Sequence, residues 1–520
     1  MVLITAAVFA RVAGFPFVLW DDTIELYQNG NFNPPSLQHL ATLWLHPTLA
    51  IYVPMTDTVW TLLAMLARLP APDPVLGGTL DPHVFHIANL AVHLLNVAMV
   101  FVILRLLVGR DLPAAAGALL FGIHPVQVES VAWASEMRGL LAACFSLAAI
   151  LAYLLRTRVP KTTGRLLYAG ALAAALLAVL SKPSAVGLPL ALFAVDLFLL
   201  RRTFRSAALS AAPFLLSAVP LVLVTLAAQQ VEKSLLTPPL TRPFIAGDTL
   251  AFYLAKLALP LGLGIDYGRK PGIVAGHWWG YVTWLAPAMV AALAWWLRRR
   301  APWVAAGALI ALAAVVPVIG LVPFAYQHYS DVADRYLYLA LLGVSLVIAQ
   351  ILAIASDRFR WALPLAVAWL LTLAVLTTVQ VGYWDGTIPL MTQALAVNPQ
   401  SDVAYNNRGI AYARMHRYAE AKADFIASLR INPDRYDTHS NLGNVYLLEK
   451  DPGAAINEYK TSIALNPSWD ESHANYGNAL GAEGRYADAK YQFEIALRLN
   501  PTSTTARRGL EDMNAILARK

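Results

Sequence analysis

Cysteine is almost absent from this 520-residue sequence, in which Cys144 is the only one. A single cysteine excludes an intramolecular disulfide and excludes zinc held by several cysteine ligands. The sequence also has no P-loop, no Rossmann glycine fingerprint, no zincin motif and no nucleophile elbow. Chemistry driven by a bound nucleotide is therefore not expected, and any group transfer would need a donor that is already activated.

Charge is scarce as well, because only 14% of the residues are charged while 58% are hydrophobic. Soluble domains carry roughly 25% charged residues. From Asp385 onward the chain has 15 basic and 16 acidic residues, whereas residues 1–384 have 24 basic and 16 acidic ones. The basic clusters each follow an apolar run, and none is interleaved with aromatic residues. Membrane topology therefore explains the basic excess better than nucleic-acid binding does.

Long apolar runs fill the first part of the chain and predict helices that span a membrane. Runs of spanning length cover residues 84–104, 130–155, 207–228, 278–297, 302–323, 336–355 and 361–381. Shorter runs cover 112–123, 166–180 and 184–200, and a first run ends at Trp20. We therefore expect an all-α fold, with about 11 spans in a domain over residues 1–384.

Arginine and lysine occur in every second loop between these runs. The basic loops hold Arg105 and Arg110, then 156–165, 201–205, 298–300, and finally Arg358 and Arg360. The positive-inside rule makes these loops cytoplasmic. The other loops, including 229–277 and 324–335, then lie on the extracytoplasmic side, and an odd number of spans puts the carboxyl-terminal segment there too. The chain is rich in Ala, Leu, Arg and Pro, which suggests a bacterial source. We therefore predict a multi-pass protein of a bacterial inner membrane.

The first apolar run is interrupted by Arg11. About ten apolar residues make only about 15 Å of helix, against a hydrocarbon core of about 30 Å. Either Arg11 snorkels toward the outer face or the chain starts inside its first span, and the second interpretation is favoured. A cleaved signal peptide is not expected, because no basic segment precedes the run.

Four Asn-Pro pairs recur with a period of 34 residues at Asn398, Asn432, Asn466 and Asn500. This is the period of tetratricopeptide repeats (TPRs), in which two helices pair through a small residue and an aromatic one. We predict a TPR domain over 385–520, with repeats at 402–435, 436–469 and 470–503 and a capping helix at 504–518. Asn407, Asn441 and Asn475 take one equivalent position on the first helix of each repeat. A ladder of amides there would bind an extended peptide through its backbone, unless the asparagines only stabilise their helices.

Acidic residues mark the first extracytoplasmic loop, where Asp21-Asp22 follows the apolar Phe17-Val18-Leu19-Trp20. A carboxylate at this place can act as a general base, although a solvated helix end would look the same. Arg138, Lys182 and Arg335 lie at the outer ends of spans. Such cations suit a lipid phosphate, or else they pair with Glu129 or Glu136.

Further polar side chains interrupt the apolar runs. His86, Asn89, His93 and Asn96 share one helix face, which favours hydrogen bonds between helices over a metal site. His124 precedes Glu129, and His328 and Asp334 lie in a segment rich in tyrosine. These residues are further site candidates, unless Asp334 and Arg335 only cap a helix beside interfacial tyrosines. No ligand cluster requires a metal, although a divalent ion could assist the chemistry.

Five motifs in this order resemble the transmembrane-and-TPR-containing (TMTC-type) protein O-mannosyltransferases and their bacterial relatives. They are 17–22 (FVLWDD), 86–96 (HIANLAVHLLN), 124–131 (HPVQVESV), 180–183 (LSKP) and 333–338 (ADRYLY). The resemblance implies a GT-C type membrane glycosyltransferase with a polyprenyl-phosphate-linked sugar as donor. It assigns the catalytic carboxylate to Asp21, with Asp22 in support. One departure concerns 136–139, which reads EMRG where the family usually has a sequence like GRAD.

These observations together lead to a functional hypothesis. The chain would transfer a monosaccharide, mannose or a similar sugar, from the lipid donor to Ser or Thr of a protein held by the TPR groove, with inversion. The alternatives are a non-enzymatic TPR scaffold for envelope proteins and a transporter. A transporter is expected to carry charge at mid-span, whereas the charges here gather at the outer ends of the spans.

Overall fold

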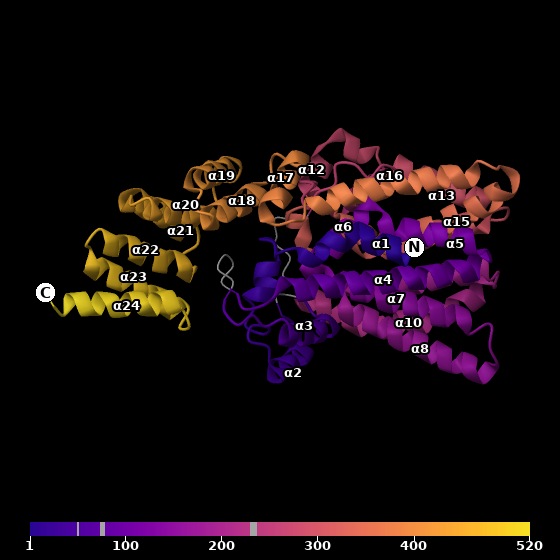
Figure 1. The fold of residues 1–520 in the computed structure, drawn as a ribbon, viewed down its shortest axis with the longest axis horizontal. Helices are drawn as coiled ribbons and strands as arrows, with labels where there is room; N and C mark the ends of the chain where they lie inside the picture. The colour runs from indigo at the N-terminus through magenta and orange to yellow at the C-terminus, as the bar shows by residue number, and fades with distance from the viewer. Residues whose placement is uncertain (49–50, 73–77, 229–236, 520) are drawn as a thin grey trace. The chain divides into compact units, whose positions relative to one another are not determined.

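The computed structural model describes residues 1–48, 51–72, 78–228 and 237–519, which form two compact units, Met1–Gly386 and Thr387–Lys520 (Figure 1). Helices make up both units, and the described residues contain isolated β-bridges but no strand. The prediction of an all-α fold is therefore confirmed. Part of the predicted outer loop 229–277, residues 229–236, lies outside the described residues.

Unit 1 is a bundle of sixteen α-helices among the described residues. They are α1 (Val2–Phe9), α2 (Leu37–Leu45), α3 (Pro54–Leu66), α4 (Pro82–Val108), α5 (Asp111–Ile123), α6 (Val128–Ala132), α7 (Met137–Leu155), α8 (Lys161–Ser181), α9 (Leu188–Ala194), α10 (Phe204–Ala228), α11 (Arg242–Ala258), α12 (Pro271–Gly276), α13 (Leu285–Leu297), α14 (Pro302–Val315), α15 (Leu341–Arg358) and α16 (Ala362–Gly382). The long helices α4, α7, α8 and α10 lie lengthwise in a row, in which α7 packs on α4 and α8, and α8 packs on α10, while α16 runs lengthwise against α5 and α15 (Figure 1).

Helix α4 shows how the sequence sets the ends of these helices. The Asp81 side chain accepts a hydrogen bond from the His83 N–H, and Pro82 takes the first helical position, where a missing N–H costs nothing. The helix ends at Gly109, whose φ of +76° suits a residue without a Cβ. Between these two signals the helix is apolar over enough length to cross a bilayer.

Seven helical segments of the described chain are long and apolar enough to cross a membrane, judged by length and composition. They are Pro82–Val108, Ala134–Leu155, Lys161–Ser181, Phe204–Ala228, Trp278–Leu297, Leu341–Arg358 and Ala362–Gly382. Four shorter apolar helical segments of unit 1 are Val2–Gly14, Asp111–Ile123, Pro183–Leu199 and Pro302–Val318. These eleven segments correspond to the eleven predicted spans, and their insertion in a membrane remains a prediction.

Four of the predicted apolar runs differ from the helical segments by five or six residues at one end. The first run reaches Trp20, whereas its helical segment ends at Gly14. The run 166–180 belongs to a longer helix, Lys161–Ser181. The run 302–323 stops being helical at Val318, after Pro317 has removed a backbone donor, and Gly320 then adopts a φ of +89°. The run 336–355 becomes α-helical only at Leu341, because the Arg335 N–H bonds the Glu129 carboxylate at 3.0 Å instead of a helical carbonyl.

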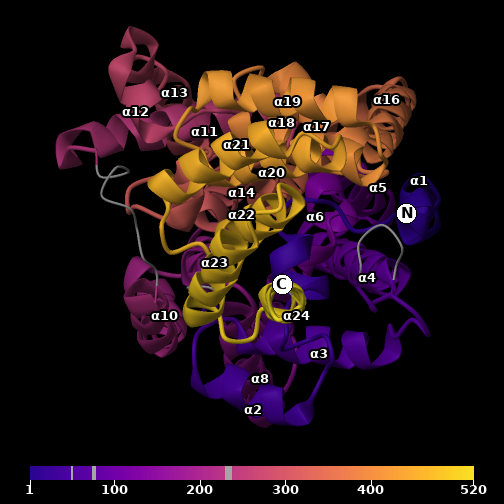
Figure 2. The ribbon, with the colours of Figure 1, turned by 90° about the vertical axis from the view of Figure 1, so that its left-hand side faces the viewer.

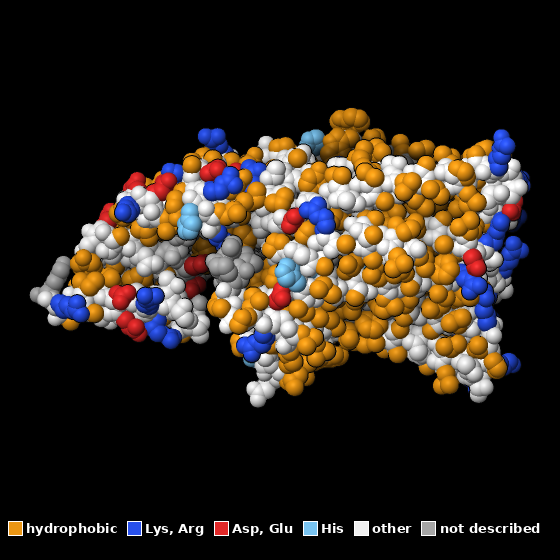
Figure 3. Space-filling view, viewed as in Figure 1, with side chains coloured by type: hydrophobic (Ala, Val, Ile, Leu, Met, Phe, Trp, Pro, Cys, Tyr) orange, Lys and Arg blue, Asp and Glu red, His pale blue; other side chains and the backbone are white. Residues whose placement is uncertain are grey.

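The two ends of unit 1 differ in charge. Figure 3 shows apolar side chains over the flank of the bundle and blue Lys and Arg side chains gathered at its right-hand end. At this end the Arg110 guanidinium, before α5, pairs at 2.8 Å with Asp357 at the end of α15. At the opposite end Arg11 pairs with Asp385 at 3.0 Å, after α16. Arg11 therefore points toward the end that we expect to be extracytoplasmic.

Unit 2 is a stack of antiparallel helix pairs that follow a curved path (Figure 2). Its helices are α17 (Thr387–Val397), α18 (Asp402–Arg414), α19 (Tyr418–Ile431), α20 (Tyr436–Leu448), α21 (Pro452–Leu465), α22 (Asp470–Ala482), α23 (Tyr486–Leu499) and α24 (Thr504–Leu517). In each predicted repeat a glycine of the first helix lies against an aromatic ring of the second. The pairs are Gly409 with Phe425, Gly443 with Tyr459, and Gly477 with Phe493.

Helix α17 was not predicted, although the first Asn-Pro pair marks its end. It buries Leu390, Met391, Ala394 and Leu395 and packs on α18. The Asn398 N–H bonds the Ala394 carbonyl at 2.7 Å, much as Asn432 closes α19. The first Asn-Pro pair therefore marked the end of a helix that precedes the three predicted repeats, although no consensus positions were assigned to that helix.

Candidate functional site

The candidate site lies at the end of unit 1 where the chain turns after Trp20. Asp22 holds this turn in place, because its side chain is fully buried and accepts three hydrogen bonds. The Val18 N–H bonds one carboxylate oxygen at 3.0 Å, while the Ser135 N–H, at 3.0 Å, and the Ser135 hydroxyl bond the other. Asp22 therefore fastens the first loop to the start of α7 and is not open to a ligand.

Asp21, its neighbour, has the opposite exposure. Its side chain is 45% exposed, and its Oδ2 lies 4.0 Å from Nη2 of Arg138. Desolvation by the surrounding protein raises the pKa of Asp21 above its usual range, and the positive charges of Arg138 and Arg335 oppose that rise. Burial likewise raises the pKa of Asp22, to about 6, against the hydrogen bonds from Ser135 and Val18. Asp21 is thus the carboxylate of the pair that is accessible for proton transfer.

Arg138 connects Asp21 to a second carboxylate that sequence reasoning missed. Its Nη1 donates to Glu25 Oε1 at 2.8 Å, and both side chains are nearly buried. Glu25 lies on a π-helical turn, Thr23–Tyr27, and its N–H bonds the Asp21 carbonyl at 2.8 Å. The spacing of four residues between Asp21 and Glu25 was the available signal, because it puts both on one face of a helical turn.

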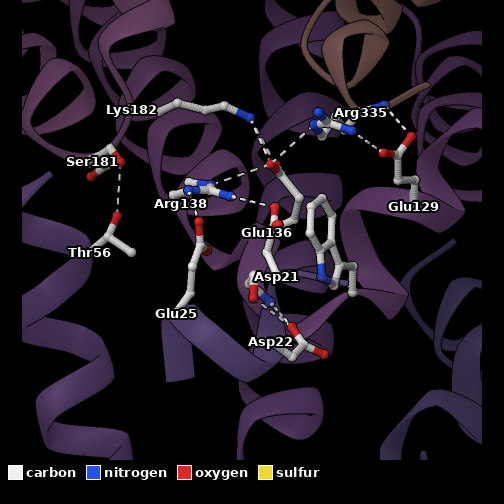
Figure 4. A network of polar contacts seen from close by, with 12 residues as sticks. Asp21, Asp22, Glu25, Thr56, Glu129, Glu136, Arg138, Ser181, Lys182 and Arg335 are labelled. Carbon is white, nitrogen blue, oxygen red and sulfur yellow. Dashed lines mark hydrogen bonds and ion pairs between the residues drawn. The ribbon is translucent and has the colours of Figure 1, made fainter. Parts of the chain in front are cut away.

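Glu136 lies at the centre of the network. Figure 4 shows Arg138, Lys182 and Arg335 pointing toward its buried carboxylate from different elements. The Lys182 Nζ is 2.9 Å from Glu136, and the Nε atoms of Arg138 and Arg335 are each 3.6 Å from it. The three cations that the sequence suggested therefore meet in space, around the carboxylate that the sequence offered as an alternative partner.

Arg335 is held on both its charged edge and its flat faces. It donates through Nη1 and its backbone N–H to the Glu129 carboxylate. Its guanidinium carbon lies 4.0 Å from the centre of the Tyr326 ring and 4.9 Å from that of Tyr336. Such stacking fixes the plane of a guanidinium and leaves little freedom for the side chain.

Gly139 makes room for this cluster. A Cβ at this position would overlap the Glu136 carboxylate and would come within 3.3 Å of the Lys182 Nζ. Residues 136–139, where the chain departs from the resembled motif, thus supply both the central carboxylate and the space beside it. On the other side, the Thr56 hydroxyl bonds the Ser181 carbonyl at 2.9 Å and joins α3 to the end of α8 (Figure 4).

Two cavities open beside the cluster. A narrow cavity of about 60 Å³ has Lys182 and Arg335 in its lining, together with apolar residues of α7, α9 and α14. A larger cavity of about 520 Å³ lies among α11, α13, α14 and α15, and its almost wholly apolar walls include Leu337. Cationic groups therefore line the narrow cavity, and Leu337, two residues after Arg335 in the chain, lines the apolar one.

The polar stripe of α4 serves packing in this structure. His86 Nε2 contacts the Pro16 carbonyl at 3.3 Å, and His93 lies between the Tyr338 hydroxyl and the Gly122 carbonyl. The stripe's two asparagines donate to the carbonyls of Trp133 and Leu140. His93 and Asn96 thus bond groups of other helices, as that interpretation expects, whereas His86 and Asn89 bond carbonyls that lie between helices. The part of the chain that the structure describes contains no group of three residues suited to a metal.

The remaining candidates lie outside the network around Glu136. His124 contacts the Leu257 carbonyl at 3.3 Å, and His328 is exposed with its ring against Tyr329. Asp334 accepts a hydrogen bond from the Tyr267 hydroxyl at 2.7 Å and does not cap a helix through its side chain. Asp57, which was not predicted, is buried in α3, and its pKa is raised to about 7 by burial, against the charge of Arg138.

The asparagine ladder in unit 2 is partly engaged within the protein. The Asn441 amide donates a hydrogen bond at 3.0 Å to the Asn406 side chain, which directly precedes the ladder residue Asn407. The Asn406 amide in turn donates to the Asn407 side chain. Asn475 lines a polar hollow of about 360 Å³ beside Asp470 and Glu471. Of the three, Asn475 therefore borders open space, while the other two belong to a chain of amides.

Comparison with known proteins bears on unit 2. Residues 403–435 and 436–468 each match the tetratricopeptide repeat family. A search of curated proteins found no match. Similar solved structures include the first TPR of Spaghetti (RPAP3) bound to the HSP90 peptide SRMEEVD, with 24% identity over 23% of this chain and 94% of that one and a TM-score of 0.23. The Sgt2 TPR domain from Aspergillus fumigatus has 19% identity over 22% of this chain and 79% of that one, with a TM-score of 0.22. The carboxyl-terminal region of this chain therefore contains tetratricopeptide repeats.

Proposed function

We propose that the chain is a membrane glycosyltransferase that moves a monosaccharide from a polyprenyl-phosphate donor to a Ser or Thr hydroxyl of a protein. The observation that carries the proposal is that a half-exposed carboxylate, Asp21, lies at the same end of the bundle as three cations, of which Arg138 is 4.0 Å from it while Lys182 and Arg335 gather around Glu136. A base and a site for a leaving phosphate are the two elements that inverting transfer requires. The resemblance to TMTC-type enzymes supports this assignment.

In the proposed reaction, Asp21 accepts the proton of the acceptor hydroxyl as the oxygen attacks the anomeric carbon. The bond from that carbon to the phosphate oxygen breaks on the opposite face, and the phosphate leaves with the electron pair. Lys182 and Arg335, which line the narrow cavity, stabilise the charge that develops on this phosphate. Arg138 acts through Asp21 and Glu25, because its ion pairs with them fix the position of the base.

The isoprenoid tail of the donor would lie in the apolar cavity among α11, α13, α14 and α15. Its volume of about 520 Å³ is in the range of ligand pockets, roughly 300–1,000 Å³, and its walls offer apolar contact to a chain that has no polar groups. The exposed apolar side chains of the bundle support a membrane setting in which such a donor is available (Figure 3).

The repeats of unit 2 would bind the acceptor protein. Repeats of this kind present a groove to extended peptides, and two of the similar structures, both from RPAP3, hold peptides of HSP90 and HSP70. In this chain we assign the acceptor contacts to Asn407, Asn441 and Asn475. The extracytoplasmic side of a bacterial inner membrane is the proposed location of both the reaction and the repeats.

The test is transfer of radiolabelled mannose from polyprenyl-phosphate mannose to a periplasmic protein extract by the purified chain in detergent. We expect labelled protein with the wild type and a loss of about 10²–10⁴-fold in rate with Asp21→Asn. Asp111→Asn serves as the matched control, because Asp111 is an exposed aspartate of the opposite, basic end of unit 1. Equal transfer by wild type and Asp21→Asn would refute the role of the base.

If mannose is not transferred, a panel of polyprenyl-phosphate sugars separates the remaining possibilities. Transfer of another sugar, lost in Asp21→Asn, would identify the donor. No transfer from any member, by a protein that still captures peptides, would favour the scaffold, in which the repeats recruit envelope proteins and Asp21 is dispensable.

A further inference from the structure

A second polar site lies at the basic end of unit 1, far along the helices from Asp21. The end of α7, the start of α8 and the start of α10 enclose a hollow of about 950 Å³. We call it the basic hollow, and its lining includes Arg156, Lys161, Arg165, Tyr168, Arg202 and Arg205. Nothing in the proposed transfer reaction uses these residues.

The floor of the basic hollow is a built structure. Arg156 is 14% exposed and stacks on the Tyr153 ring at 3.6 Å, with the Tyr168 ring 4.8 Å away. Asp196 is fully buried beneath it, accepts a hydrogen bond from the Tyr153 hydroxyl at 2.7 Å and pairs with Arg202 at 3.3 Å. Among the described residues, Nε and Nη2 of Arg156 have no hydrogen-bond partner, although Nη2 lies 3.9 Å from Asp196. The Asp196 carboxylate thus holds both Arg156 and Arg202 in place, and its single negative charge does not balance all the positive charges of the lining.

The rim of the basic hollow carries the surplus charge. Lys161, Arg165 and Arg205 are exposed, and none forms an ion pair within the described ranges of the chain. Gly164 lets α8 approach the end of α7, because a Cβ there would lie 2.9 Å from the Arg156 carbonyl oxygen. Lys161, Arg165 and Arg205 therefore line the same hollow.

Exposed apolar side chains neighbour the rim cations along the chain, with Leu166 directly after Arg165 and Phe204 directly before Arg205. Leu166 is 73% exposed, Phe204 is 69% exposed and Leu209, itself part of the lining, is 65% exposed. A ligand with an anionic head and apolar chains would place its head among the cations and its chains along these residues. A free anion would make no contact with these exposed apolar side chains.

We propose that the basic hollow binds the phosphate headgroup of an anionic phospholipid, with its acyl chains along Leu166, Phe204 and Leu209. Basic pockets between membrane helices on the cytoplasmic side are suited to such headgroups. Guanidinium groups bind phosphate oxygens through paired hydrogen bonds, and the stacked Arg156 is already oriented for such contact. The inference rests on the proposed membrane setting and is independent of glycosyl transfer.

The experiment measures binding of phosphatidylglycerol and phosphatidylcholine to the full chain in detergent by native mass spectrometry. The test variant combines Lys161→Gln, Arg165→Gln and Arg205→Gln. Its control combines Arg299→Gln, Arg358→Gln and Arg360→Gln, which removes the same charge from exposed positions of the same end. We expect the wild type to prefer phosphatidylglycerol and the test variant to lose at least about tenfold in affinity, while the control stays within about twofold.

Two further arms decide the source of the phosphate and the place of binding. Inorganic phosphate should not displace the lipid, and if it protects the wild type against heat as well as phosphatidylglycerol does, a free anion is the ligand and the proposal is wrong. A photoactivatable phosphatidylglycerol should label peptides from 156–168 and 202–210 of the wild type. Labelling elsewhere, or equal losses in both variants, would also overturn the proposal.

Discussion

The carboxylate of Asp21 lies 4.0 Å from the guanidinium of Arg138, which joins the first loop of the chain to the start of α7. The adjacent Asp22 bonds Ser135 in the same region and is fully buried. One aspartate of the pair is therefore structural, and the other is open to solvent. This division gives the two residues different expected phenotypes.

The pH dependence of transfer tests the contact between Asp21 and Arg138. A base must be ionised, so the rate should rise as pH increases through the pKa of Asp21. Arg138 opposes the rise in that pKa, and removing its charge should move the acidic limb of the pH–rate profile to higher pH. We would measure kcat against pH in Arg138→Gln combined with Glu25→Gln, which avoids leaving Glu25 buried and unpaired. The reference is Glu25→Gln alone, because the charges of Glu25 and Asp21 repel each other and the loss of Glu25 by itself shifts the pKa of Asp21. Arg138→Lys keeps the charge and should leave the limb near its original position, whereas an unmoved limb in the double variant would contradict the assignment.

Asp22→Asn should lower stability more than it changes the chemistry. The amide nitrogen that replaces one oxygen cannot accept a backbone N–H, so the loss is about 1–3 kcal/mol. Burial raises the folded-state pKa of Asp22 to about 6, so the native state binds the proton more tightly than the unfolded one does. The stability that this proton contributes is present at low pH and is lost as pH rises through about 6.

Thermal unfolding in detergent between pH 4 and 8 would show this difference. As the pH rises from 4 to 7, the unfolding temperature of the wild type should fall relative to that of Asp22→Asn. Parallel pH dependences of the two proteins would mean that Asp22 does not titrate in this range.

Glu136→Gln should be strongly destabilising. The carboxylate is 1% exposed and is shared by Lys182, Arg138 and Arg335, so its removal leaves buried positive charge with less compensation. Breaking a buried ion pair from one side costs about 3–5 kcal/mol. The fraction of folded chain after graded heating would report the loss, with the exposed Glu420→Gln as control. Restoration by Lys182→Met in the Glu136→Gln background would show that uncompensated charge is the cause, and no restoration would argue against it.

Alanine at Asn407, Asn441 and Asn475 together should weaken capture of an unfolded peptide by the full chain. Asn457→Ala is the matched control, because this asparagine is exposed on the second helix of its repeat. Asn475→Ala alone should have the larger single effect, since Asn475 borders a hollow while Asn441 donates within the protein. Fluorescence anisotropy of a labelled peptide would measure the affinities, and unchanged binding by the triple variant would remove the asparagines from the groove.

Gly443→Ala should loosen the second repeat. The added Cβ would lie 2.8 Å from the Tyr459 ring, and a buried ring in a packed pair of helices has little room to move. We expect a loss of about 1–3 kcal/mol and faster hydrogen exchange in α20 and α21 than in α23. Combining the change with Tyr459→Leu should recover part of the loss, whereas unaltered exchange in Gly443→Ala would show that the helices can separate freely.

Local and periodic signals in the sequence were enough to predict the helical class, the repeats and the long apolar segments. The small residue and the aromatic ring of each TPR pair recur at fixed spacing, so Gly409 and Phe425 could be paired without coordinates. Apolar run length predicted the eleven apolar segments of unit 1 for the same reason. It failed at 336–340, where the Glu129 carboxylate, distant in sequence, takes the Arg335 N–H.

Which charged groups meet depends on how the helices pack in three dimensions. Arg138, Lys182 and Arg335 stand far apart in the chain, and no local rule relates them to Glu136 or distinguishes the buried Asp22 from the accessible Asp21. Buried charges are arranged by long-range packing, because each must find a counter-charge that another helix supplies. The site is therefore a property of the bundle, while the elements that build it are properties of the sequence.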